Sequence, residues 1–282
     1  MPRRQIKEIR PAKRADLGEM YTRAPMSGSA EDRLDPFLVL AHHGPQDYAA
    51  DSARPPSSPH PHRGFETVTF IVGGDLVHKD SAGHRSLIGA GGVQWLTAGS
   101  GVVHSEQGSD AFWKTGGRLE LLQLWVNLPA RLKMSAPRYA GVEASEIPSA
   151  PLPGGGALRL VSGEFDRLVG PVESLTGVFI STVSLPGGAH ACLPAPQGRT
   201  VLFYVIQGQV AVNGVVLSGG DLVTFSEGDG IDARGVQDAL VLFGHGDPIG
   251  EPVVNGGPFV MNSQAEIEAA FSDYRSGRFG RV

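Results

Sequence analysis

A pattern of strands and glycine turns that occurs twice is the feature that most constrains this chain. Phe70–Val77 (FIVGGDLV) aligns with Tyr204–Ala211 (YVIQGQVA) at an offset of 134 residues, and Gly91–Leu96 aligns with Gly219–Thr224 at an offset of 128. Both copies have the same order of strand, glycine turn, strand and second glycine turn. Two copies of one β unit fit a length of 282 residues. The sequence therefore predicts a duplicated β domain.

Short strands separated by turns continue through most of the sequence. Glu66–Val72 is rich in β-branched residues, and Leu119–Val126 is a continuous apolar strand. The 39 glycines and 21 prolines supply the turns that such an arrangement needs. Near the end, Ser263–Glu266 is a capping box, followed by apolar residues at helical spacing. We expect an all-β fold, a sandwich or a closed barrel, with one short C-terminal helix.

A stretch rich in proline, serine and glycine between Pro137 and Gly156 separates the two copies. We place the boundary just before it, so that the domains are 1–134 and 135–282. The net charge of −5 gives no basic excess for nucleic acid. The single cysteine, Cys192, cannot form an intramolecular disulfide, and no stretch approaches the ~18 apolar residues that cross a bilayer. We expect a cytoplasmic protein that binds neither membranes nor nucleic acid directly.

Histidine and carboxylate side chains occur at strand spacing in the first copy. His60 and His62 form an H-x-H pair, and His104 and Glu106 form an H-x-E pair. Residues i and i+2 of a strand face the same side, so each pair can direct both side chains toward one point. Glu66 follows His62 at an even step and shares its face if no bulge intervenes. Imidazole and carboxylate groups from two strands predict a site for a divalent metal such as Fe, Ni, Mn, Zn or Cu.

The other histidines are weaker candidates. His42 and His43 follow an apolar run, where lining a pocket and lying at an exposed strand end both remain open. His78 and His84 flank a hairpin and are interpreted as turn residues. The sequence has neither a nucleophile-elbow motif nor a phosphate-binding loop. The predicted chemistry therefore depends on the H-x-H and H-x-E pairs.

Longer strings in the same regions resemble the pirin family of the cupin superfamily. The strings are His60–Thr69 (HPHRGFETVT), Asp80–Gly83, Val93–Gly101 and His104–Glu106, with further matches at Asp35–Leu38 and Gly257–Asn262. The resemblance thus covers nearly the whole chain. It implies a bicupin, which is a fold of two cupin-type β-barrels, with the final helix packed beside them.

The resemblance also implies the ligands of one metal per chain, in the N-terminal barrel. Carried over by position, they are His60, His62, His104 and Glu106. The metal that it implies is Fe(II), with Ni, Mn, Zn or Cu as alternatives. Many cupins take the carboxylate from the position of Glu66 instead, and the sequence alone does not decide between the two glutamates.

The internal alignment predicts that the second barrel holds no metal. Opposite the four ligands it sets Pro194, Pro196, Asp232 and Arg234. Proline has no side-chain ligand atom, and the guanidinium of an arginine would repel a cation. Region 135–282 is therefore expected to be a degenerate, metal-free cupin barrel.

Two functions follow from the resemblance. Some pirins cleave flavonols with O₂, as quercetin 2,3-dioxygenases do, which implies a metal-dependent oxidoreductase for small phenolic substrates. A carboxylate near the metal, Glu106 or Glu66, would take the proton of the substrate hydroxyl. Other pirins are described as non-catalytic, iron-binding regulators of a transcription factor or a metabolic enzyme, so a protein partner is the alternative. An open pocket above the metal would favour the enzyme.

Overall fold

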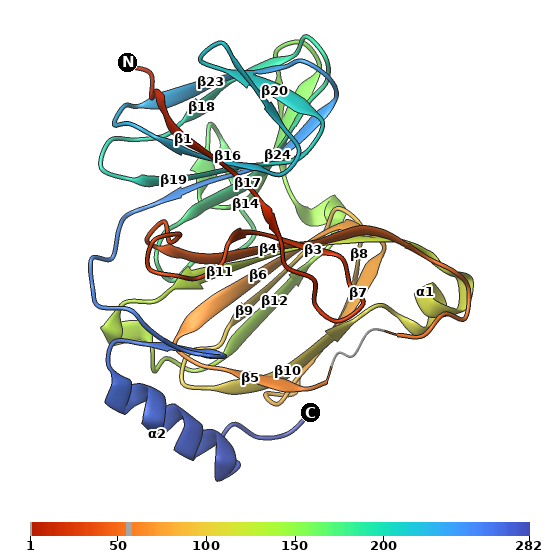
Figure 1. Cartoon of the computed structure of the whole chain (residues 1–282), viewed down its shortest axis with the longest axis vertical. Coiled ribbons are helices and arrows are strands. Elements are labelled where there is room, and N and C mark those ends of the chain that lie inside the picture. The colour runs from red at the N-terminus through yellow and green to blue at the C-terminus, as the bar shows by residue number, and fades with distance from the viewer. Residues whose placement is uncertain (1, 55–57) are drawn as a thin grey trace. The chain divides into compact units, whose positions relative to one another are not determined.

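β-strands make up most of the protein in the computed structural model, which describes residues 2–54 and 58–282 (Figure 1). These residues contain two α-helices, α1 (Asp110–Thr115) and α2 (Gln264–Arg275), and α2 lies where the capping box predicts a helix. Neither of the two is long and apolar enough to cross a membrane. The predicted all-β fold class with a short C-terminal helix is confirmed.

One compact unit, here called the N-terminal barrel, comprises residues 14–33, 37–145 and 249–282. Its larger sheet has the strand order β12-β9-β6-β11-β4-β3-β2, and its smaller sheet has the order β5-β10-β7-β8. The strand bounds are β2 Lys13–Arg14, β3 Thr22–Met26, β4 Phe37–Tyr48, β5 His60–His62, β6 Phe65–Gly73, β7 Asp75–Asp80, β8 Arg85–Gly89, β9 Val93–Thr97, β10 Val102–Gln107, β11 Gly117–Asn127 and β12 Arg138–Val142. A further hairpin consists of β25 Val254–Gly256 and β26 Phe259–Met261.

The other unit, here called the C-terminal barrel, comprises residues 1–13, 34–36 and 146–248. Its sheets have the orders β1-β22-β19-β24-β17-β14-β13 and β18-β23-β20-β21. The strand bounds are β1 Ile6–Pro11, β13 Ser149–Leu152, β14 Gly156–Ser162, β17 Phe179–Leu185, β18 His190–Pro194, β19 Thr200–Gln207, β20 Gln209–Val212, β21 Val215–Ser218, β22 Asp221–Phe225, β23 Gly230–Gly235 and β24 Ala239–Gly246. Two further strands, β15 Glu164–Phe165 and β16 Leu168–Val169, pair with each other.

The two barrels repeat one strand order. The series β9-β6-β11-β4 in the N-terminal barrel corresponds to β22-β19-β24-β17, and β5-β10-β7-β8 corresponds to β18-β23-β20-β21. The internal repeat in the sequence falls on corresponding strands, because Phe70–Val77 spans β6 and β7 and Tyr204–Ala211 spans β19 and β20. The duplication is therefore visible in the topology as well as in the sequence.

The compact units differ from the continuous division into 1–134 and 135–282. Strand β1 pairs with β22, which assigns the first 13 residues to the C-terminal barrel. Helix α2, drawn in blue near β5 and β10 in Figure 1, buries Ile267 and Ala270 against Val103 and Phe259 of the N-terminal barrel. The reason is that an edge strand and an apolar helix face take the partners nearest in space rather than those nearest in sequence.

Candidate metal centre

Three histidines converge inside the N-terminal barrel. His60 and His62 lie on β5 and His104 lies on β10, where it is directly opposite His60 in the antiparallel ladder. One ring nitrogen from each histidine lies within 4.8 Å of the others. The side chains of His62 and His104 are buried, with 3% and 0% of their surface exposed. Alternation along two paired strands thus aims three imidazoles at one point.

The ring nitrogens of these histidines fit a metal ion. Nδ1 of His62 lies 3.1 Å from the carbonyl oxygen of Pro258, and Nδ1 of His60 lies 3.2 Å from that of Ser58. Because a carbonyl oxygen only accepts, both contacts keep a proton on Nδ1 and leave a lone pair on Nε2. Within the described residues, Nε2 of His62 and both ring nitrogens of His104 are buried without a hydrogen-bond partner. Buried orphan nitrogens are costly, and a bound cation would satisfy them.

Burial keeps two of these imidazoles neutral. Desolvation, with a smaller contribution from the neighbouring histidines, lowers the pKa of His62 to about 3 and lowers the pKa of His104 well below its ordinary value. A neutral imidazole is the form that ligates a metal. The imidazoles of His62 and His104 are therefore in the neutral form that can bind a metal cation at neutral pH.

Glu106 lies beside the same cluster, together with a fourth histidine. Its Oε1 accepts a hydrogen bond from the hydroxyl of Thr69 at 3.0 Å, and its Oε2 accepts one from the amide of Gln123 at 2.8 Å. Ligand atoms of His78, His104 and Glu106 all lie within 4.8 Å of one another. His104 belongs to both groups, which places Glu106 and His78 at the edge of the three-histidine cluster.

His78 is not a turn residue, so that interpretation is wrong. Its side chain is 1% exposed, and it lies on β7 directly opposite Glu106. Nε2 of His78 is 3.0 Å from a carboxylate oxygen of Asp80, and the ring stacks on Tyr139 with centroids 4.1 Å apart. The sequence carried the signal, because Leu76, His78 and Asp80 alternate toward the interior of β7.

The structure does not bring Glu66 to this cluster. Glu66 is three residues from Thr69 on the regular strand β6, so the two side chains lie on opposite faces. Its Oε1 accepts a hydrogen bond from the hydroxyl of Thr97 at 2.7 Å, and burial raises its pKa. Between β5 and β6 the chain passes through Gly64 at a φ of 89°, so the even step from His62 does not preserve the face.

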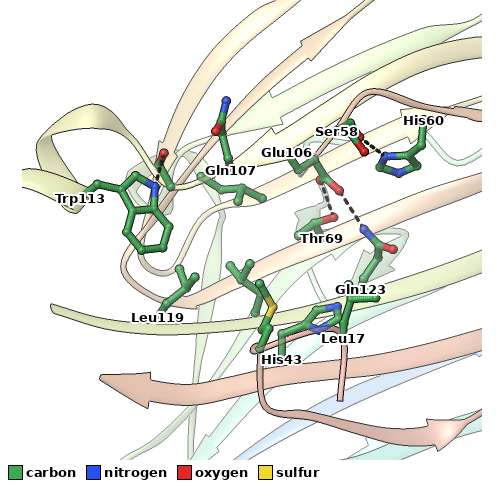
Figure 2. A pocket seen from close by; sticks show the side chains of 14 residues that line it. Leu17, His43, Ser58, His60, Thr69, Glu106, Gln107, Trp113, Leu119 and Gln123 are labelled. Atoms are coloured by element: carbon green, nitrogen blue, oxygen red, sulfur yellow. Dashed lines mark hydrogen bonds between the residues drawn. The ribbon is translucent and has the colours of Figure 1, made fainter. Parts of the chain in front are cut away.

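A cavity of about 370 Å³ adjoins Glu106 and His60 (Figure 2). It is lined by Leu17, Met20, His43, Ser58, His60, Thr69, Leu76, Glu106, Gln107, Gly108, Trp113, Leu119, Leu121 and Gln123. Figure 2 shows Glu106, Thr69 and Gln123 linked by hydrogen bonds on one side and Trp113 and Leu119 on another. The cavity therefore combines an apolar wall with a polar end at the proposed metal ligands.

The two adjacent histidines of β4 lie in different surroundings. His43 lines the cavity, which settles the alternative that the sequence left open for it. His42 is 0% exposed, and its Nε2 lies 2.9 Å from Oε1 of Glu120, which is also buried. Desolvation lowers the pKa of both imidazoles. Only His43 of this pair can contact a molecule in the cavity.

In the C-terminal barrel, the inward positions of the corresponding strands are apolar. Leu193 of β18 pairs directly with Ile231 of β23. The same apolar core contains Ala191, Ala195, Val210, Val212 and Ala233. Asp232 and Arg234 are exposed, which is the wrong face for a metal ligand. The alignment that set them opposite His104 and Glu106 is therefore wrong, because a one-residue slip of register exchanges the two faces of a strand.

Two related family models match separate parts of the chain. The Pirin family model matches residues 19–126, and the model of the pirin C-terminal cupin domain matches residues 180–280. A Pseudomonas aeruginosa protein named "Putative quercetin 2,3-dioxygenase PA2418" is 39% identical over 251 residues, which are 88% of each chain. A pirin-like protein of Caulobacter vibrioides is 38% identical and covers 99% of this chain and 100% of its own length.

Solved structures show the same fold. A crystal structure of quercetin 2,3-dioxygenase from Acinetobacter baumannii is 34% identical, with a TM-score of 0.92 over 100% of both chains. The bacterial pirin YhhW of Escherichia coli, solved in complex with nickel(II), is 22% identical, with a TM-score of 0.67 over 86% of this chain and 99% of its own. At that identity the second match bears on the fold alone. The predicted arrangement of two cupin domains is confirmed.

Proposed function

The chain belongs to the pirin family of cupin proteins, and on that premise we propose that it is a metal-dependent dioxygenase that acts with O₂ on flavonol-like phenols. The observation that carries the proposal is the cavity of about 370 Å³ that adjoins His60 and Glu106. A ligand pocket of this kind typically has apolar walls and a few polar groups that orient the ligand. A binding protein that acts only through its surface has no need of such a cavity. The names of the relatives in Pseudomonas aeruginosa and Acinetobacter baumannii support the same activity.

In this proposal, His60, His62, His104 and Glu106 hold one divalent metal per chain. Fe(II) is the first candidate, and Ni, Mn, Zn and Cu are the alternatives, because three imidazoles and one carboxylate suit all of them. When bound, the metal supplies Lewis acidity and the chemistry with O₂. The unpartnered ring nitrogens of His62 and His104 support this ligand set.

The protein side chains hold the substrate and move its proton. Among the described residues that line the cavity, Glu106 is the single carboxylate, so it is the group that would take the proton of a phenolic hydroxyl. Thr69 and Gln123 each donate a hydrogen bond to one of its oxygens and thereby fix its orientation. Trp113 and Leu119 offer an apolar surface to an aromatic ring and exclude water from it. Glu66, on the other face of β6, has no part in this step.

The test is aerobic turnover by protein loaded with a single metal. Metal-free protein is reconstituted in turn with Fe(II), Ni(II) and Mn(II), and the loss of quercetin absorbance is followed together with O₂ uptake and carbon monoxide release. We expect equal consumption of quercetin and O₂ with at least one metal and none with the His62→Ala variant as control. Fully loaded protein that leaves quercetin intact would contradict the proposal and favour the non-catalytic regulator.

A further inference from the structure

His43 lines the cavity but is neither one of the proposed metal ligands nor the proposed proton acceptor. It lies on β4 directly opposite Leu121 of β11, which in turn pairs with Ile71 of β6. Two strand spacings, roughly 10 Å, therefore separate the backbone of His43 from that of β6. Figure 2 draws the ring of His43 below Glu106 and Thr69, next to Gln123. A ligand held at Glu106 would have to extend across the cavity to reach His43.

The hydrogen bonds around His43 define which of its ring nitrogens carries the proton. The hydroxyl oxygen of Thr22 lies 2.9 Å from Nδ1 of His43, and the same hydroxyl lies 3.2 Å from the carbonyl oxygen of Met20. A hydroxyl has one proton, and the carbonyl can only accept it. Both contacts are satisfied when Thr22 donates to Met20 and Nδ1–H of His43 donates to Thr22. Nε2 then carries a lone pair and no proton.

The Nε2 atom of His43 is an unused hydrogen-bond acceptor. The structure gives it no hydrogen-bond partner within residues 2–54 and 58–282. Desolvation and, to a smaller extent, the neighbouring His42 together lower the pKa of His43 to about 4, so the ring stays neutral at neutral pH. Leu17, Met20 and Leu121, which line the same cavity, are apolar and donate nothing to it. The acceptor is available to a molecule in the cavity.

We propose that His43 determines specificity by accepting, at Nε2, a hydrogen bond from a hydroxyl group of the substrate that is remote from the metal-binding hydroxyl. This inference rests on the proposed function and narrows its substrate class to flavonols with additional hydroxyl groups. Apolar walls alone discriminate weakly between substrates that differ by a hydroxyl. Nε2 of the half-buried His43 discriminates more strongly, because a bound substrate that fills the cavity but lacks the hydroxyl excludes water from this acceptor and leaves it unpaired.

The test compares two ligands that share one chelating group. Quercetin and 3-hydroxyflavone both have the 3-hydroxyl and 4-keto groups, but quercetin has four further hydroxyls. Their dissociation constants are measured by calorimetry under argon on protein loaded with Zn(II), so that binding is read without turnover. We expect the wild type to prefer quercetin by roughly 10-fold, the size of one buried hydrogen bond. In His43→Phe the preference should fall to about one, through weaker binding of quercetin alone.

Two further variants separate the hydrogen bond from the shape of the cavity. His43→Gln keeps an acceptor oxygen and should retain part of the preference, and it replaces His43→Phe if that variant does not fold. Thr22→Val keeps the side-chain shape but removes the hydroxyl that fixes the protonation of Nδ1, and we expect it to reduce the preference. Circular dichroism checks the fold of each variant.

Two results would overturn the inference but leave the proposed function intact. One is an unchanged preference for quercetin in His43→Phe. The other is an equal loss of affinity for both ligands, which would show that His43 only shapes the cavity. If neither ligand binds to the wild type, the proposed function fails and this inference fails with it.

Discussion

His60 and His104 form a directly paired couple across β5 and β10 of the N-terminal barrel, whereas Leu193 and Ile231 form the corresponding inward couple across β18 and β23 of the C-terminal barrel. The strand order around both couples is the same. Apolar side chains are thus sufficient to fill a barrel of this topology. Within the described residues, both ring nitrogens of His104 are buried without a hydrogen-bond partner, which lowers stability unless a ligand satisfies them. The polar interior of the N-terminal barrel is therefore not something that this topology needs in order to fold.

The largest expected effect is a loss of stability caused by a substitution in the apolar core of the C-terminal barrel. Phe243 is fully buried in the C-terminal barrel and contacts the rings of Phe179 and Phe203. Phe243→Ala leaves a cavity there and should lower the free energy of unfolding by about 3–5 kcal/mol. Guanidinium denaturation measures this loss. Metal content per folded chain should not change, and a loss of metal from folded Phe243→Ala would show that the two barrels are not independent in this respect.

The next largest expected effect is the loss of metal binding when the imidazole of His62 is removed from the N-terminal barrel. His62→Ala should weaken metal binding by more than about 100-fold. This is more than the loss usually seen when a residue that only hydrogen-bonds to a metal ligand is removed. Mass spectrometry should find one metal per wild-type chain and none in the variant, with the β-sheet circular dichroism retained. The matched control is His190→Ala, which removes an exposed histidine of the C-terminal barrel and should keep the metal. Two tightly bound metals per wild-type chain would break the comparison.

Residue spacing predicted those features of the site that lie along a single strand. The pair His60 and His62, and the pair His104 and Glu106, each depend only on the two-residue period of an extended chain. The alternation along β7 indicates that His78 is buried, but its position beside Glu106 depends on a neighbour across the ladder. It faces Glu106 only because β7 pairs with β10, and spacing within one strand does not show which strands pair.

A shift of one residue accounts for the remaining differences. The even step from His62 to Glu66 implied a shared face only without a bulge, and Gly64 between them has a positive φ and leaves the extended conformation. Asp232 was placed opposite His104 by extending an offset from one hairpin to a later strand, which identified the correct strand but the wrong face, because the side-chain period is two residues. An error of one residue leaves the predicted strands and their order unchanged. The same error turns the side chain of a predicted ligand away from the site.

Glu106 and Glu66 of the N-terminal barrel should differ in how much each contributes to metal binding. Glu106→Gln should weaken metal binding by roughly 100-fold, because it replaces an anionic ligand with a neutral amide beside the cation. Glu66→Gln should change it by less than about 10-fold, since Glu66 lies on the other face of β6 and its amide can still accept from Thr97. Metal occupancy after dialysis against a mild chelator measures both. An empty Glu66→Gln variant beside a loaded Glu106→Gln variant would reverse the assignment of the ligand.

The smallest expected effect is on the pH dependence of stability, and it comes from a buried imidazole of the C-terminal barrel. His245 on β24 is 4% exposed, and its ring stacks on Phe179 with centroids 4.7 Å apart. Desolvation, together with the nearby Arg199 and Arg4, lowers its pKa to about 3. It is therefore a histidine that burial keeps neutral, as burial also does for His62, but its ring packs against Phe179 and Phe243 rather than against other histidines.

This histidine should make the protein sensitive to acid. The unfolded chain binds the proton with the ordinary histidine pKa of about 6.5, whereas the folded chain does not bind it until about pH 3. The unfolded state thus holds more protons in this window, so stability falls as the pH drops below about 6.5, by at most about 1.4 kcal/mol per pH unit. His245→Phe keeps a ring against Phe179 and removes this contribution. Its denaturation midpoint should decline less than that of the wild type between pH 7 and pH 5, and the histidines of the N-terminal barrel cancel in the difference because both proteins contain them. Equal declines would show that the imidazole of His245 takes up its proton in the folded state, and the C-terminal barrel would then have a more polar interior than its packing indicates.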